Sequence, residues 1–304
     1  MNLKYTNFKI KATELYLDEN KEKALDFLQM ALENTDKIQE KIDILYFQAL
    51  IKDELNENEE SYQAYEKIYG LDGQQAAALY GMAMISEKTG DYKRAEKLYK
   101  SCIDLDPEYD RAYFFLANLY DLMKDFDQAI IYYNKTLDLV EDDYMAYNNL
   151  GSIYENKQDY KKSIEMLNKS IAIEPNYFRS YFNLGVVYAK MKEIDKAFDY
   201  YYKSLALNPN YSNTYLNMSA LYIEENNYPE AINILNLGIE NNDDSANLYY
   251  NRACSYIKLN NVNCSLRDLD IAVSLDKDII KYARKDEDFE KIRETEKFKK
   301  IMGD

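Results

Sequence analysis

Residues 144–177 read YMAYNNLGSIYENKQDYKKSIEMLNKSIAIEPNY, and residues 178–211 read FRSYFNLGVVYAKMKEIDKAFDYYYKSLALNPNY. These stretches are consecutive copies of one 34-residue unit. Both carry a Leu-Gly pair at the same place, with Gly151 aligned to Gly185, and both end in Pro-Asn-Tyr. A fixed period of this size indicates an array of structural repeats that bury their apolar faces against one another.

The period extends in both directions without insertion and gives seven repeats, which begin at residues 42, 76, 110, 144, 178, 212 and 246. Two positions are always small. Position 8 holds Ala49, Ala83, Ala117, Gly151, Gly185, Ser219 and Ala253, and position 20 holds Ser61, Ala95, Ala129, Ser163, Ala197, Ala231 and Ser265. Small side chains allow two helices to approach closely. Large residues surround them at spacings of 3, 4 and 7, which are helical spacings.

The break between the two helices of a repeat is also regular. Position 16 holds Asp91, Asp125, Asp159, Asn227 and Asn261 in five repeats, and short polar side chains of this kind cap helices. Pro107, Pro175 and Pro209 fall between repeats, where each second helix must end. Each repeat is therefore predicted to be an antiparallel helix pair, and the fold all-α.

With small residues at 8 and 20, an aromatic residue at 11 and proline at 32, the pattern resembles the tetratricopeptide repeat. The resemblance implies a right-handed superhelical solenoid of antiparallel helix pairs. Local departures include Lys52 and Ser86, which stand where tyrosine is expected at position 11 of the first two repeats. We expect a degenerate N-terminal capping unit over 1–41, seven repeats over 42–279 and C-terminal capping helices over 280–304. A basic membrane-binding or partner-binding helix is the alternative for the last segment.

Composition restricts the function. There are 54 acidic and 38 basic residues, with a formal net charge of −16, so nucleic acid is a poor partner. The chain has no histidine, and its three cysteines have no CxxC spacing, which argues against a metal site. The first residues lack the apolar core of a signal peptide, and no 18-residue apolar run occurs. We expect a cytoplasmic protein without membrane insertion.

Catalysis has no support in the motifs. The sequence contains no GxxxxGK[ST], GxGxxG or HExxH pattern, and a serine–histidine triad is impossible without histidine. We expect no enzyme activity and no cofactor. The remaining possibility is recognition. In the tetratricopeptide family, positions 2, 5, 6, 9, 12 and 13 of each first helix line the concave surface.

Position 6 is asparagine in four successive repeats: Asn149, Asn183, Asn217 and Asn251. This row resembles the asparagine ladder of superhelical family members. An amide both donates and accepts hydrogen bonds, which suits the backbone of an extended peptide. The alternative is a structural role for the asparagine within the array.

Position 5 is aromatic in five repeats, at Tyr46, Tyr80, Phe114, Phe182 and Tyr250. These side chains are candidates for apolar contacts with a ligand, and packing against a neighbouring first helix is the alternative. Arg111 and Arg179 at position 2 are candidates for holding an acidic ligand side chain.

Chaperone-binding family members grip a carboxylate with lysine at position 5 and asparagine or arginine at position 9. Here position 5 never holds lysine, and only Asn118 matches at position 9, so a carboxylate clamp is not expected. The sequence therefore predicts a non-catalytic scaffold or adaptor that binds a peptide or protein segment. A regulatory subunit of an enzyme, or of a secretion or assembly complex, would use the same surface.

Overall fold

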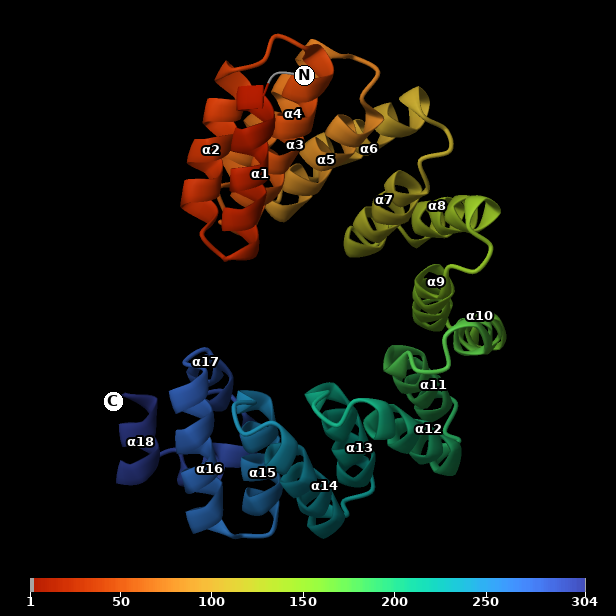
Figure 1. Ribbon diagram of the computed structural model, residues 1–304. Helices are drawn as coiled ribbons and strands as arrows, with labels where there is room; N and C mark the ends of the chain where they lie inside the picture. The colour runs from red at the N-terminus through yellow and green to blue at the C-terminus, as the bar shows by residue number, and fades with distance from the viewer. Residues whose placement is uncertain (1–2, 304) are drawn as a thin grey trace. The chain divides into compact units, whose positions relative to one another are not determined.

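The structure of the protein is a computed structural model that describes residues 3–303, and this part of the chain is helical, with no strand. Figure 1 shows the helices in chain order. They are α1 (Leu3–Leu17), α2 (Lys21–Glu33), α3 (Ile38–Glu54), α4 (Asn58–Leu71), α5 (Ala76–Lys88), α6 (Tyr92–Leu105), α7 (Asp110–Leu122), α8 (Phe126–Leu139), α9 (Tyr144–Asn156), α10 (Tyr160–Ile173), α11 (Phe178–Lys190), α12 (Ile194–Leu207), α13 (Ser212–Glu224), α14 (Tyr228–Asn241), α15 (Ala246–Lys258), α16 (Val262–Leu275), α17 (Ile279–Ala283), the 3₁₀ helix η1 (Glu287–Ile292) and α18 (Glu296–Met302).

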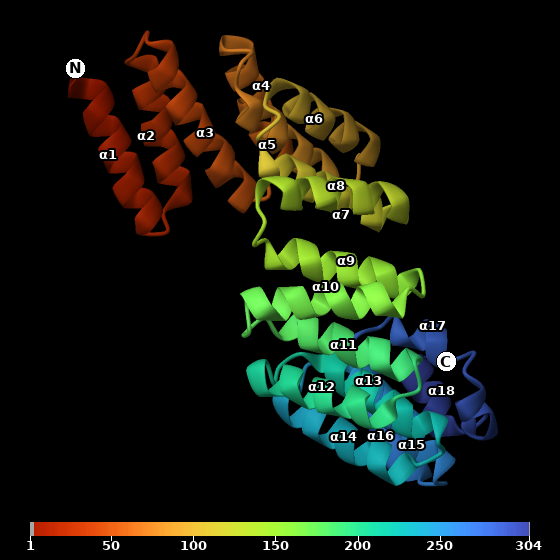
Figure 2. The ribbon, with the colours of Figure 1, turned by 90° about the vertical axis from the view of Figure 1, so that its right-hand side faces the viewer.

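The chain divides into two compact halves, Met1–Ala146 and Tyr147–Asp304, and the division falls in the first turn of α9. Within each half, consecutive helices pack as pairs: α1 on α2, α3 on α4, α5 on α6 and α7 on α8 in the first, and α11 on α12, α13 on α14 and α15 on α16 in the second. Figure 2 shows α10, α11 and α12 following one another in the C-terminal half. The all-α solenoid of helix pairs predicted from the period is confirmed in each half.

The first helices α5, α7, α9, α11, α13 and α15 begin 34 residues apart. Four second helices carry the predicted cap, in which the side chains of Asp91, Asp125, Asp159 and Asn261 accept from the backbone N–H three residues on. Asn227 precedes α14 without such a bond, so this predicted cap is not formed.

The turn between the helices of each repeat places position 15 in the left-handed region of backbone space. These residues are Asn56, Gly90, Lys124, Gln158, Lys192, Asn226 and Asn260, with φ between 57° and 83°. Glycine adopts this conformation without a Cβ clash, whereas lysine and glutamine do so at a cost.

The small residue at position 8 faces the large residue at position 24 of the same repeat. A Cβ added to Gly151 would lie 2.5 Å from Leu167 Cγ, and one added to Gly185 would lie 2.5 Å from the Tyr201 ring. The serines at position 20 add a polar link, because Ser61 Oγ donates to the Ala49 carbonyl and Ser163 Oγ to that of Gly151. The close helix contact predicted at positions 8 and 20 is therefore present in these repeats.

The C-terminal segment packs onto the last helix pair. Phe289, Ile292, Phe298 and Met302 are buried in one cluster with residues of α15 and α16, including Leu269. Tyr282, in contrast, is largely exposed. The segment thus covers apolar surface that the last pair would otherwise leave in water.

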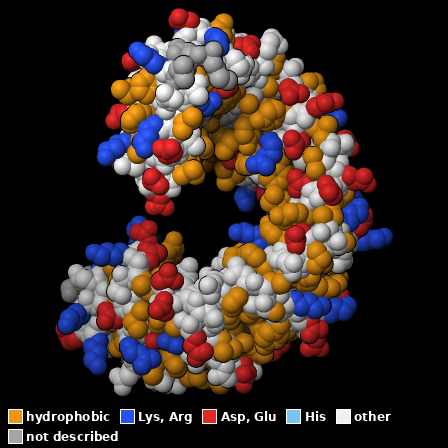
Figure 3. Space-filling view, viewed as in Figure 1, with side chains coloured by type: hydrophobic (Ala, Val, Ile, Leu, Met, Phe, Trp, Pro, Cys, Tyr) orange, Lys and Arg blue, Asp and Glu red, His pale blue; other side chains and the backbone are white. Residues whose placement is uncertain are grey.

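The surface is charged, with acidic and basic side chains interspersed over the face in Figure 3. None of the helices within residues 3–303 combines the length and the apolar character that crossing a bilayer requires.

Candidate functional site

The asparagine row lies in the C-terminal half, on the successive first helices α9, α11, α13 and α15. Each of these four side chains is half-buried. Their hydrogen bonds divide the row into two pairs with different surroundings.

Asn149 and Asn183 belong to a network built around Asn148, which is buried at 4% exposure. Asn148 Oδ1 accepts from Ser180 Oγ at 3.1 Å and from Asn183 Nδ2 at 3.0 Å. Asn148 Nδ2 donates to Asn149 Oδ1 at 3.1 Å, and Ser180 Oγ lies 2.7 Å from Ser170 Oγ. These bonds join α9, α10 and α11, so the amides of Asn149 and Asn183 have a structural use.

Asn148 and Ser180 were not predicted from the sequence. The sequence feature that could have indicated Asn148 is its place at position 5, where five of the seven repeats have an aromatic residue. A buried carboxamide requires partners, and that requirement points to polar side chains on the adjacent helices.

Asn217 and Asn251 bond only within their own helices. Asn217 Nδ2 donates to the Asn213 carbonyl at 2.9 Å, and Asn251 Nδ2 donates to the Asn247 carbonyl at 2.8 Å. Within residues 3–303, no group donates to either Oδ1 atom. These two oxygens are acceptors available to a ligand.

The aromatic side chains at position 5 are half-buried by packing inside their own repeats. Tyr46 contacts Tyr65, Tyr80 contacts Tyr99 and Tyr109, Phe114 contacts Tyr133, and Phe182 contacts Tyr201 and Tyr211, with ring centroids 5.1–6.1 Å apart. These partners stand at positions 24 and 34. Packing thus accounts for part of each ring, and the rest of the ring is accessible.

Part of the first helix of the last repeat, at Tyr250 and Lys258, is covered by the chain itself. Tyr250 Oη donates to Asp286 Oδ2 at 2.5 Å, and the Tyr250 ring contacts Phe289. Lys258, further along α15, pairs with Asp288. The hydroxyl and one side of the ring of Tyr250 are therefore engaged by η1 and by Asp286, which precedes it.

Cys254, Asp286 and Asp288 bring one ligand atom each within 4.8 Å of one another. This set suits a cation poorly, because Asp286 already accepts from Tyr250 and Asp288 is paired with Lys258. Burial also raises the pKa of the Cys254 thiol, which disfavours the thiolate that binds metal.

The remaining predicted residues lie near aromatic rings. The exposed Arg111 guanidinium lies 5.6 Å from the centre of the Phe115 ring. Arg179, also exposed, lies 5.5 Å from that of Phe178. Asn118 accepts a hydrogen bond from the Tyr133 hydroxyl, which gives this amide a packing role.

Comparison with known proteins identifies the repeats. Two family models described as tetratricopeptide repeat match residues 87–150 and 178–211, and one described as TPR repeat matches residues 152–192. No sequence among the curated proteins matches the chain.

Several solved structures share the fold at low identity. A tetratricopeptide repeat protein from Parabacteroides merdae aligns with a TM-score of 0.65 and 15% identity, over 87% of this chain and 99% of its own. The APC/C hetero-tetramer Cut9-Hcn1 aligns with a TM-score of 0.60 and 18% identity, over 88% of this chain and 52% of its own. MamA from Desulfovibrio magneticus aligns with a TM-score of 0.52 and 19% identity, over 56% of this chain and 97% of its own. On its period, its helix pairs and these family matches, the chain is a tetratricopeptide repeat protein.

Proposed function

We propose that the protein is a non-catalytic interaction scaffold that binds an extended segment of another protein along the first-helix face of the C-terminal half. The observation that carries the proposal is the pair Asn217 and Asn251, whose Oδ1 atoms accept no hydrogen bond from residues 3–303. They occupy the same position on successive first helices, α13 and α15. An extended backbone presents N–H groups regularly, so acceptors at a repeating spacing suit it whatever its side chains.

The neighbouring side chains add selectivity to this proposal. Phe182, whose ring is half-buried, offers an apolar contact on α11. Arg179 is exposed at the start of the same helix and would meet an acidic side chain of the ligand. Tyr250 contributes through its accessible edge alone, because its hydroxyl is bonded to Asp286.

The N-terminal half has a related surface. Tyr46, Tyr80 and Phe114 stand at position 5 of its three complete repeats, with Arg111 and Asn118 on α7. Position 6 of these repeats holds Phe47, Gly81 and Phe115 rather than asparagine. This surface would therefore hold a ligand by apolar contacts rather than by backbone hydrogen bonds.

Several features support a partner that is a protein. The net charge of −16 disfavours nucleic acid. The position-5 residues lack the lysine of a carboxylate clamp, so the proposed partner is not a chaperone held by its C-terminal carboxylate. Cut9, which has this fold, is seen in a hetero-tetramer with Hcn1. We place the protein in the cytoplasm and assign it no catalytic activity. A role as a regulatory subunit would use the same face.

The test begins with peptide display to select a ligand, followed by dissociation constants for variants. Asn217→Ala with Asn251→Ala should weaken binding by about 0.5–1.5 kcal/mol per residue, the net contribution of one hydrogen bond. The matched control is Asn241→Ala on the second helix α14, because Asn241 Nδ2 makes the same kind of bond, to the Leu237 carbonyl at 2.8 Å. Unchanged affinity in the double variant would overturn the proposal.

A further inference from the structure

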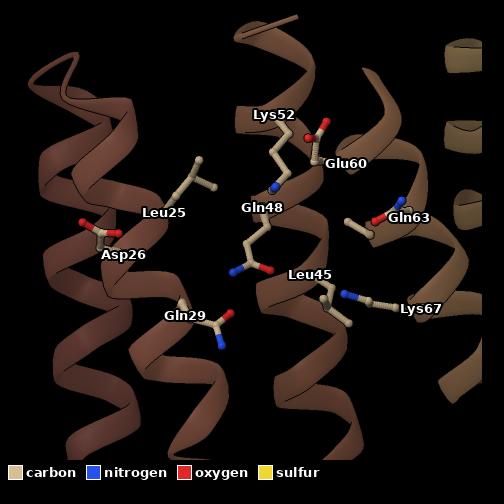
Figure 4. A pocket seen from close by; sticks show the side chains of 10 residues that line it. Leu25, Asp26, Gln29, Leu45, Gln48, Lys52, Glu60, Gln63 and Lys67 are labelled. Carbon is tan, nitrogen blue, oxygen red and sulfur yellow. The ribbon is translucent and has the colours of Figure 1, made fainter. Parts of the chain in front are cut away.

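A pocket with a volume of about 290 Å³ opens in the N-terminal half between the second helices α2 and α4, above α3. Figure 4 shows the side chains that line it. The pocket lies at repeat 1, and three repeat positions are unusual there. Position 7 is Gln48, position 11 is Lys52 and position 23 is Ala64.

Repeats 3 and 5 fill this place with a stacked pair of tyrosines from positions 11 and 23. Tyr120 stacks on Tyr132 with centroids 5.5 Å apart and planes at 17°. Tyr188 stacks on Tyr200 with ring centroids 5.2 Å apart and ring planes at 6°. In repeat 1 both rings are replaced, by Lys52 and Ala64, and the space that they would occupy is open.

The lysine that accompanies the stacked pair of repeat 5 has an equivalent here. Lys203 at position 26 of repeat 5 lies 4.7 Å from the centre of the Tyr200 ring. In repeat 4, which lacks the pair, Lys169 at position 26 lies 5.5 Å from the ring centre of Tyr147 at position 4. Lys67 is the position-26 residue of repeat 1, and it lines the pocket. In Figure 4 it extends from α4 toward Leu45, where its repeat provides no ring.

The floor of the pocket is polar. Gln48 is 8% exposed and stands where repeats 3 to 5 have leucine. No group within residues 3–303 hydrogen-bonds to its carboxamide. In repeat 7 the polar residue at position 7, Arg252, is met by Asp268 at position 23 at 2.6 Å, but in repeat 1 position 23 is an alanine. The Gln48 carboxamide lines the open pocket, so its donor and acceptor are available to a polar group of a ligand.

The geometry points to a binding site for a tyrosine side chain of a partner protein. The aromatic ring would take the place of the missing pair, beside Leu25, Leu45 and Ala64 and under the Lys67 ammonium. Its hydroxyl would reach the Gln48 carboxamide, which can donate and accept. The site uses the space between second helices, so it is separate from the face proposed above to bind an extended segment.

The probe for this site is p-cresol, the side-chain analogue of tyrosine, with toluene as the analogue that lacks the hydroxyl. Titration of the full chain followed by two-dimensional NMR should shift the side-chain amide signal of Gln48, identified by its loss in Gln48→Leu. We expect Gln48→Leu to weaken p-cresol binding about 2- to 10-fold, the equivalent of one hydrogen bond, and to leave toluene binding unchanged or tighter.

Lys52→Tyr combined with Ala64→Tyr restores the pair found in repeats 3 and 5 and should abolish binding of both probes. The matched control is Lys97→Tyr, which adds a ring at an exposed site on α6 and should bind as wild type does. The proposal is overturned if wild type does not bind p-cresol at millimolar concentrations, if the double-tyrosine variant binds it as wild type does, or if Gln48→Leu weakens both probes equally.

Discussion

The ring of Tyr201 lies directly against the Cα of Gly185, so close that a Cβ on Gly185 would be 2.5 Å from two ring carbons. Tyr201 is fully buried, with 1% exposure, and cannot move aside without disturbing its own contacts. This contact joins α11 to α12. The backbone of the first helix and the ring of the second are therefore in direct contact in repeat 5.

Gly185→Ala should lower the free energy of unfolding by about 1–3 kcal/mol, the usual cost of overpacking, and Gly185→Leu by more. Urea denaturation followed by circular dichroism measures the change. Gly70→Ala on α4 is the control, because nothing lies within 4 Å of the Cβ that it adds. A Gly185→Ala protein that unfolds with the wild-type midpoint would contradict the close contact.

Position 15 provides a second test of stability. Lys192 adopts a φ of 63° and Asn226 one of 57°. Lys192→Gly should raise the free energy of unfolding by about 0.5–1 kcal/mol, because glycine has no Cβ to clash in this region. Asn226→Gly should have a smaller effect, since asparagine tolerates the left-handed conformation better than lysine. Equal effects of the two changes would show that strain at Lys192 is not the cause.

The sequence predicted the repeat architecture well because each repeat reports it independently. Position 8 is small in all seven, and the structure shows the reason at Gly151 and Gly185, which face Leu167 and Tyr201. Features that occur once were not predictable in this way. The Asn148 network depends on polar side chains of three helices that meet only in the folded chain.

The pocket in repeat 1 was also not predictable from one position. Lys52 departs from the tyrosine expected at position 11, but the effect of this change depends on two further changes. Ala64 removes the stacking partner, and Gln48 places an amide on the floor. Only the folded structure shows that these three positions meet at one place.

The ion pair of Arg252 and Asp268 is the most deeply buried one described here. Arg252 Nε lies 2.6 Å from Asp268 Oδ2, and Asp268 is fully buried. Arg252→Met would leave that carboxylate buried and poorly compensated, which typically costs about 3–5 kcal/mol. The exposed Arg267, 3.4 Å away, would offset part of the loss.

A double-mutant cycle checks this prediction. Arg252→Met combined with Asp268→Leu removes both charges, so the double variant should be more stable than Arg252→Met alone. Thermal and urea unfolding of the two single variants and the double variant give the coupling. If the double variant is the less stable of the two, Asp268 does not depend on Arg252.

Glu87 on α5 predicts a dependence on pH. Burial raises the pKa of its carboxyl above the ordinary value of 4.5, although the Tyr99 hydroxyl donates to it at 2.8 Å. A raised pKa means that ionising Glu87 costs more in the folded state than in the unfolded state, so this cost is present at neutral pH. Glu87→Gln removes the charge and keeps an acceptor for Tyr99, so it should be more stable than wild type at pH 7.

That advantage should shrink as the pH falls through the raised pKa and should vanish below 4.5, where Glu87 is protonated in both states. Glu40→Gln is a control of opposite sign, because hydrogen bonds from Lys37 and Thr35 lower the pKa of Glu40. It should lose stability at pH 7 and approach wild type in acid. Unfolding curves between pH 3 and 7 compare the two variants, and changes of the same sign would refute the assignment.

The two pairs within the asparagine row predict opposite results for the same substitution. Asn183→Ala removes the donor that reaches Asn148 Oδ1 at 3.0 Å from another helix, so it should lower the free energy of unfolding by about 1 kcal/mol. Asn217→Ala removes a bond to the carbonyl of its own helix, so its effect on stability should be within about 0.5 kcal/mol.

Affinity for a displayed peptide should show the reverse order. Asn217→Ala should weaken binding, whereas Asn183→Ala should bind almost as wild type does in its folded fraction, since its amide is already held by Asn148. Unfolding curves and dissociation constants measured on both variants separate the roles. If Asn183→Ala weakened binding and left stability intact, the Asn148 bond would not hold Asn183, and the whole row would be available to the ligand.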